Sequence, residues 1–190
     1  MIEPSPTAAR GPILSGPRVF LRPWTEQDFN LCLKWFSQAE VQRVALARRP
    51  WPWTRMGDHL KALLTDPESE QFVVALKATS QPIGLCGLFA LDEKHKTAEV
   101  GLVVGEAFAR GQGYGTEALE LLMDHAFRTR QLEKLFLHVY SGNLPAVRLY
   151  EKAGFRTVIE LRQGWLSLGK KGKILVMEKR RSPGPEKGGQ

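Results

Sequence analysis

The feature that most constrains the fold is a glycine-rich segment, residues 110–116, which reads RGQGYGT. It follows an apolar run over residues 98–104, which predicts a strand, and it leads into a helix expected to start near Thr116. Glycine lets a backbone adopt dihedral angles that other residues avoid and approach a ligand closely. A helix N-terminus adds free N–H groups and the positive end of the helix dipole. The segment is therefore predicted to be an anion site, and phosphate is the usual occupant of such a site.

Two common phosphate-binding loops fit this segment poorly. A P-loop needs Gly-Lys-Ser/Thr directly before its helix, and no lysine stands there. A dinucleotide fingerprint, G-x-G-x-x-G, opens a βαβ unit, whereas this segment reads G-x-G-x-G and follows antiparallel-looking runs. A tight glycine turn that binds nothing is the structural alternative.

The apolar patterns predict a mixed α/β (α+β) domain, in which a central sheet of about seven strands is flanked by helices in the order β-α-α-β-β-β-α-β-α-β-β. The expected strands cover residues 19–22, 72–76, 83–91, 98–104, 135–140, 156–161 and 174–177. The expected helices begin at Thr25, Thr54, Gly115 and Pro145, with Gly154 as the stop of the last one. On the third helix Glu117, Glu120, Asp124 and Arg128 are predicted to face away from the core. Short links between the middle strands imply antiparallel hairpins and exclude a pure βαβ repeat.

The ends of the chain differ in composition from its body. Residues 1–17 are predicted to be a flexible lead-in, 18–181 a single domain and 182–190 a flexible tail. The start lacks the apolar segment of a signal peptide, and no stretch approaches the ~20 apolar residues of a membrane span. Cys32 and Cys86 stand among apolar neighbours and are expected to be buried free thiols. From these features a cytoplasmic protein without a membrane span is expected. No metal site is expected either, because no Cys/His spacing suggests ligands.

The formal net charge of +7 suggests a polyanionic partner. Residues 170–190 contain seven basic and two acidic residues, so most of the excess belongs to the end of the chain, where such runs are usually solvated. A nucleic-acid-binding protein would need a basic stripe interleaved with aromatic or groove-reading elements, and no such pattern is visible. No nucleic-acid partner is therefore expected.

Three motifs resemble one family. Residues 110–115 match the R/Q-x-x-G-x-G/A signature of the GNAT superfamily of N-acetyltransferases. Residues 143–155, NLPAVRLYEKAGF, resemble its N-x-x-A-x-x-L-Y-E-K-x-G-F segment. Residues 97–101, TAEVG, resemble its fourth strand, especially in the branch of ribosomal-protein N-terminal and spermidine acetyltransferases. With the opening strand at residues 19–23, the resemblance covers roughly residues 18–180.

The resemblance implies an acetyl-CoA-dependent enzyme that acetylates a primary amine by direct attack in a ternary complex. The acceptor stays open between a protein N-terminus, a polyamine, an antibiotic and a small metabolite. A homodimer is expected by analogy with this branch. The alternative is a GNAT-like module that binds acetyl-CoA as a sensor and catalyses nothing.

The resemblance also implies a binding mode for the cofactor. The pyrophosphate is expected on backbone N–H groups of the glycine segment, and the pantetheine is expected to pair with the preceding strand as an added strand would. The residues expected to bind the cofactor are Leu102, Val103, Val104, Arg110, Gly111, Gln112, Gly113, Tyr114, Gly115, Thr116, Asn143 and Ala146.

Two residues are expected to carry the chemistry. By resemblance Tyr150 is the general acid that protonates the CoA thiolate, and a phenol can do so because its pKa lies above that of a thiol. Its alternative is a core tyrosine on the apolar face of a helix. Glu99 is expected to be the base, acting through water, and its alternative is a solvated strand carboxylate.

Aromatic residues beside two prolines are expected to form part of the acceptor site. By analogy with this branch, Trp51 and Trp53 could stack on a cationic amine, or they could simply cover the core. His59 and His138 are interpreted as structural, because nothing in the sequence brings them near the amine.

Overall fold

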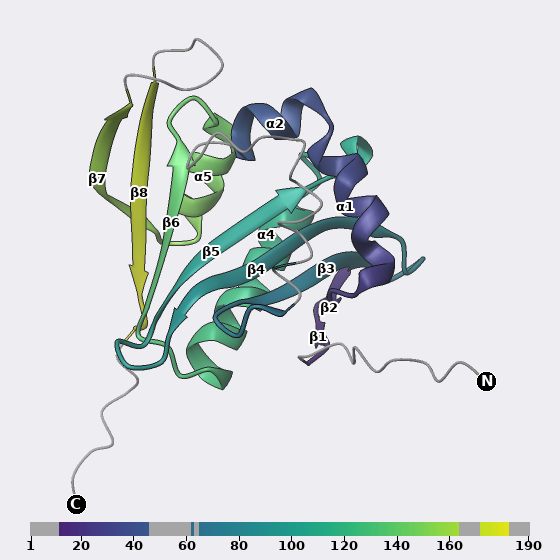
Figure 1. The fold of residues 1–190 in the computed structure, drawn as a ribbon, viewed down its shortest axis with the longest axis horizontal. Helices are drawn as coiled ribbons and strands as arrows, with labels where there is room; N and C mark the ends of the chain where they lie inside the picture. The colour runs from purple at the N-terminus through teal and green to yellow at the C-terminus, as the bar shows by residue number, and fades with distance from the viewer. Residues whose placement is uncertain (1–11, 46–61, 63–64, 164–171, 183–190) are drawn as a thin grey trace, which may run out of the picture.

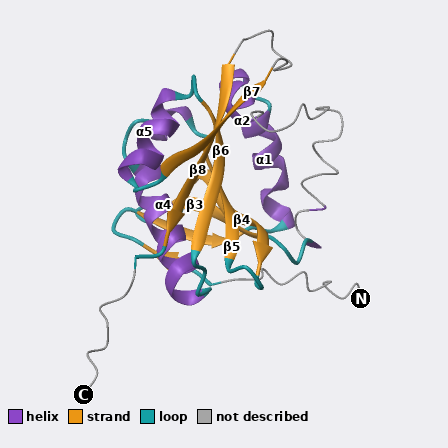
Figure 2. Cartoon of the chain, turned by 90° about the vertical axis from the view of Figure 1, so that its left-hand side faces the viewer, coloured by secondary structure: helices purple, strands orange, loops and turns teal. Residues whose placement is uncertain are grey.

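The computed structural model describes residues 12–45, 62, 65–163 and 172–182. These residues form one mixed sheet with the strand order β1-β2-β3-β4-β5-β6-β8-β7. Helices α4 and α5 cover one face of the sheet, and α1 and α2 cover the other (Figures 1 and 2). The predicted mixed α/β architecture is confirmed, with eight strands instead of about seven.

The elements follow one another closely along the chain. The strands are β1 Leu14–Ser15, β2 Val19–Pro23, β3 Glu70–Leu76, β4 Pro82–Asp92, β5 Thr97–Val104, β6 Lys134–Tyr140, β7 Arg156–Gln163 and β8 Gly172–Arg180. The helices are α1 Phe29–Phe36, α2 Ala39–Ala45, α4 Tyr114–Asp124 and α5 Leu144–Lys152, with short helical turns at Glu26–Asp28, Ala107–Ala109 and His125–Thr129.

Two elements were missed by the sequence patterns. Strand β1 lies within residues 1–17, which were predicted to be a lead-in, and it pairs Leu14 with Leu21 of β2. Helix α2 was not predicted, because seven residues are too few for a helical period to stand out. The helix expected from Thr54 onward lies largely outside the described residues.

The sheet separates two hydrophobic clusters, because successive side chains of a strand point to opposite faces. On β6, Leu135, Leu137 and Val139 are buried in the larger cluster beneath α4 and α5. The smaller cluster lies beneath α1 and includes Trp24 and Cys32. The other β6 side chains point toward the face of the sheet that α1 and α2 cover. We call this the α1 face.

The two parallel strands of the sheet, β5 and β6, are paired over only part of their length. Strands β5 and β6 pair only where residues 97–99 meet residues 134–136. Beyond Glu99, β5 keeps its pairing with β4 through Val104, and β6 keeps its pairing with β8 through Tyr140. The two strands diverge over this length in Figure 1. The facing edge of residues 100–104 is thus left for an extended ligand.

The carboxylate of Asp28 links strand β2 to the start of helix α1 through hydrogen bonds. Arg22 donates from both terminal nitrogens to Asp28, at 2.7 and 2.6 Å, and the Thr25 N–H donates to the same carboxylate at 3.1 Å. Burial of Asp28 opposes its ionisation, but the bonds from Arg22 and Thr25 outweigh it and lower the pKa of Asp28.

We expect Asp28→Asn to lower the free energy of unfolding by about 2 kcal/mol at neutral pH, because it replaces charge-assisted hydrogen bonds. The pKa of Asp28 is lower in the folded state, so its contribution is present above the pKa of the unfolded carboxyl and disappears as pH falls through the folded value. Urea unfolding of both proteins should therefore show a gap at pH 7 that narrows below about pH 4. A gap that is equal at both pH values would contradict this role.

Candidate active site

The glycine segment forms a loop whose shape requires glycine at two positions. Gly111 and Gly113 have φ values of +72° and +82°, in the left-handed region that glycine adopts most readily. A Cβ added at Gly111 would meet no atom within 4 Å, so backbone conformation and not packing makes glycine the fitting residue there. Helix α4 begins at Tyr114, slightly before the predicted start, and Gly113 caps it. The N–H groups of its first turn lack intrahelical acceptors and are available to an anion.

The loop lies directly beside the open edge of β5. A Cβ added at Gly115 would lie 3.3 Å from Cγ2 of Val104 and 3.6 Å from Cδ2 of Leu102. This close approach brings the first turn of α4 next to residues 102–104. The segments predicted to bind the pyrophosphate and the pantetheine are therefore neighbours in space.

The side chain of Arg110 is engaged by the protein itself. Its Nε donates to the carbonyl of Val104 at 3.0 Å and its Nη2 to that of Gly105 at 2.8 Å. It also contacts Gln38 and forms an ion pair with Glu40. These contacts tie the end of β5 to the junction of α1 and α2, so Arg110 positions the loop. Direct contact between Arg110 and a phosphate stays a prediction.

A second arginine, which the sequence patterns did not single out, borders the loop. Nη1 of Arg18 donates to the carbonyl of Gln112 at 3.0 Å, and its guanidinium lies 4.9 Å from the centre of the Tyr114 ring. Its side chain is 51% exposed, so its positive charge is open to a ligand at the loop.

Glu117 holds this arginine, and the prediction that Glu117 faces away from the core is wrong. It is 8% exposed and accepts the N–H groups of Arg18 at 2.7 Å and Val19 at 2.9 Å. Burial would raise the pKa of Glu117, but these bonds and the Arg18 side chain together lower it. The helical period could not reveal this, because the donors are 98 and 99 positions away along the chain.

Helix α5 carries Tyr150 on the face of the sheet that α4 also covers. Asn143 caps the helix by accepting the Ala146 N–H at 3.4 Å, and Gly154 follows it with a φ of +89°, as predicted. Tyr150 is 6% exposed and lies in the larger cluster, with its ring edge against Phe155. Burial raises the pKa of Tyr150 to about 12, and the nearby thiol of Cys86 adds to the shift. The phenol is therefore protonated at neutral pH and can donate its proton.

Glu99 lies on the α1 face, at the last paired position of β5 and β6. Its Oε1 is 2.8 Å from Nδ1 of His138, and the two side chains are 12% and 16% exposed. The ring of Phe89 packs over Gly101 on the same face, and the ring of Phe136 lies edge-on to His138. The sequence led to an interpretation of His138 as structural and did not predict this contact with the predicted base.

Three predicted residues lie outside the part of the chain that the structure describes. They are Trp51, Trp53 and His59. Both cysteines are buried free thiols, as predicted.

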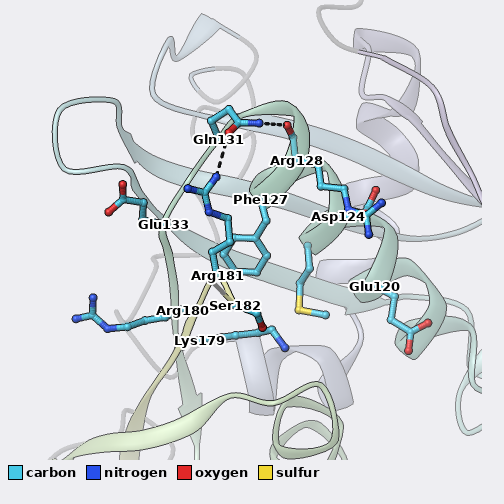
Figure 3. A pocket seen from close by; sticks show the side chains of 11 residues that line it. Glu120, Asp124, Phe127, Arg128, Gln131, Glu133, Lys179, Arg180, Arg181 and Ser182 are labelled. Carbon is cyan, nitrogen blue, oxygen red and sulfur yellow. Dashed lines mark hydrogen bonds and ion pairs between the residues drawn. The ribbon is translucent and has the colours of Figure 1, made fainter. Parts of the chain in front are cut away.

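A cavity of about 1000 Å³ opens elsewhere, between the C-terminal end of α4 and the end of β8 (Figure 3). Phe127, Arg128 and Arg181 are among the residues that line it, and Gln131 bridges the two arginines. The glycine loop lies at the opposite end of α4, so this cavity is separate from the candidate site.

Within the described ranges, none of the helices has the length and apolar character needed to cross a bilayer.

The open edge of β5 and the adjacent glycine loop agree with the acyltransferase class that the motifs indicate. The chain belongs to the acetyltransferase (GNAT) domain family, whose model matches residues 18–156. It is an N-acetyltransferase with acetyl-CoA as the donor, as predicted from its resemblance to this superfamily.

Curated relatives and solved structures agree with this membership. The spermidine N(1)-acetyltransferase of Escherichia coli K12 is 28% identical over 147 residues, which cover 77% of each chain. The human alpha/beta-tubulin-N-acetyltransferase 9 is 26% identical over 157 residues, covering 77% of this chain and 76% of its own. The crystal structure of the Vibrio cholerae spermidine N-acetyltransferase in complex with CoA and spermine has a TM-score of 0.75 and 21% identity, and the match covers 85% of this chain and 95% of that one.

Proposed function

We propose that this protein transfers the acetyl group of acetyl-CoA to a primary amine of a polyamine. The observation that supports this most directly is the opening between β5 and β6, with Tyr150 on one face of the sheet and the Glu99–His138 pair on the other. The names of several relatives support the polyamine acceptor, since they are spermidine acetyltransferases.

Several groups of the chain are suited to bind acetyl-CoA, the acetyl donor. The N–H groups of residues 111–116 suit a pyrophosphate, and Arg18 adds an exposed charge at the loop. The free edge of residues 102–104 suits the amides of pantetheine, which would add to the sheet as a strand does. Asn143 and Ala146 stand at the start of α5, on the face of the sheet that carries Tyr150. Acetyl-CoA itself supplies an activated thioester.

The reaction needs two proton transfers, and we assign one to each face of the sheet. An alkyl ammonium has a pKa near ~10, so the amine must lose a proton before it can attack. Glu99 and its hydrogen-bonded partner His138 form the candidate proton acceptor. Tyr150 donates to the leaving thiolate from the opposite face, and the backbone N–H near Val103 or Val104 polarises the acetyl carbonyl.

The α1 face suits a cationic acceptor. Glu99 is a carboxylate between the strands that carry Phe89 and Phe136, and both rings belong to this face. Aromatic faces and a carboxylate attract an ammonium group, particularly where water is largely excluded.

The test is release of free thiol from acetyl-CoA in the presence of spermidine, spermine, amino acids, an aminoglycoside and peptides with free N-termini. We expect the polyamines to give the highest kcat/KM, with thiol release near background when no amine is added. Turnover with peptides alone would contradict the polyamine acceptor. Tight CoA binding without any turnover would contradict the enzyme and favour a sensor.

A further inference from the structure

We propose that Nε2 of His138 is the atom that takes the proton from the acceptor amine, and that Glu99 is a positioning residue that fixes the imidazole. This inference rests on the proposed function and deepens it. It reverses the expected roles, in which Glu99 is the base and His138 has no part.

The hydrogen bond between the two side chains determines which nitrogen is free. An ionised carboxylate only accepts hydrogen bonds, so Nδ1 of a neutral His138, 2.8 Å from Glu99, must carry the imidazole proton. Nε2 then holds the lone pair and can act as a base. Across the part of the chain that the structure describes, Nε2 has no hydrogen-bond partner, so it is available to an amine.

The position of His138 on its strand favours the imidazole over the carboxylate. Glu99 stands opposite Phe136, at the last paired position of β5 and β6. His138 lies two residues farther along β6, where the strands have separated. It therefore borders the opening through which the thioester would reach the α1 face. Glu99 lies at the closed end, behind the imidazole.

The residues around the pair on β6 and β8 shelter the imidazole. Among the described residues, the other charged side chains of β6 and β8 on this face are Lys134, Glu178 and Arg180. Lys134 and Glu178 form their own ion pair at 3.4 Å. Phe136 shields one side of the His138 ring, and Val176 stands opposite it on β8. A carboxylate held against an imidazole in such a sheltered place stabilises the imidazolium that forms when the base takes a proton.

The transfer balances in protons and bonds. The ammonium gives one proton to Nε2 of His138, and Glu99 stabilises the resulting imidazolium. The amine nitrogen then forms a bond to the acetyl carbon, while the carbon–sulfur bond breaks and the sulfur takes the proton of Tyr150. The second proton of the former ammonium restores the Tyr150 phenol through water. His138 returns its proton to solvent.

The kinetic test compares His138→Gln with Glu99→Gln, using spermidine as the acceptor. Glutamine keeps a polar group of similar reach but cannot take a proton. We expect His138→Gln to lower kcat/KM for the amine by about 10²- to 10⁴-fold, as loss of a general base does, and Glu99→Gln to lower it by a smaller factor. The affinity for acetyl-CoA should stay unchanged in both variants.

His95→Gln is the matched control, because His95 forms the same kind of pair with Asp92, at 2.6 Å, on an exposed turn. It should leave turnover at the wild-type level. Thermal melting and CoA binding report whether each variant has folded.

A second measurement does not depend on turnover. Nitrogen-15 NMR of the imidazole in the substrate-free protein should show neutral His138 with its proton on Nδ1, and Glu99→Gln should weaken that preference. A proton on Nε2, or a larger loss of activity in Glu99→Gln than in His138→Gln, would overturn the inference. A wild-type protein that acetylates no amine would overturn the proposed function, whereas active wild type with an equally active His138→Gln would overturn only the role of His138.

Discussion

Replacement of Tyr150 by phenylalanine is expected to lower kcat by about 10²- to 10⁴-fold, the range typical for loss of a general acid. The thiolate would then leave without a proton from the protein. Affinity for acetyl-CoA should stay near the wild-type value, because the change removes one oxygen and keeps the ring that packs against Phe155. Steady-state kinetics with spermidine and calorimetric titration with CoA measure the two effects separately.

The chain offers a matched control for this substitution. Tyr140 ends β6, and its ring packs against Gly142 and Gly172. Tyr140→Phe removes the same hydroxyl from another tyrosine and should leave kcat largely unchanged. A Tyr150→Phe enzyme that turns over like Tyr140→Phe would show that Tyr150 is only a core residue.

The protonation of Tyr150 also predicts the pH dependence of this step. Burial raises its pKa to about 12, so the phenol stays protonated well above neutral pH. Ionisation of Tyr150 should therefore cause no fall in kcat up to about pH 10, where an ordinary tyrosine already ionises.

Replacement of Gly113 by alanine is expected to reduce the affinity for acetyl-CoA by at least about tenfold, equivalent to roughly 1.4 kcal/mol of lost binding free energy. With a φ of +82°, this position strains any residue that carries a Cβ, at a cost of about 1–2 kcal/mol. The new Cβ would also lie 3.1 Å from Nη2 of Arg18. Relief of this strain would rotate the N–H groups that the loop presents to the pyrophosphate.

Gly154→Ala is the control that distinguishes the effect of backbone strain on stability from an effect on CoA binding. Gly154 has a φ of +89° and follows α5, outside the glycine loop. Both variants should lose similar folding stability in urea, and only Gly113→Ala should lose affinity for CoA in calorimetric titration. Equal losses of affinity in the two variants would contradict a binding role for the loop.

Local patterns in the sequence were enough to predict most of the framework. The antiparallel strands from β3 to β5 follow from apolar runs joined by short turns, and the cap at Asn143 and the stop at Gly154 follow from the residues that helix ends prefer. The glycine loop was predicted for a similar reason, since the residue types in it constrain their own backbone. Helix α2 and strand β1 were missed because they are too short to show a period.

The sequence by itself determined the family, the glycine loop and the helix that carries Tyr150, because each depends on residues close together along the chain. The tertiary structure alone decided how residues on different elements meet. The pairing of Glu99 with His138 depends on the register of two parallel strands separated by α4, and the burial of Glu117 depends on donors 98 and 99 positions away. No local pattern records such contacts, since they form only when packing brings distant segments together. The proton acceptor proposed here is therefore visible only in the folded chain.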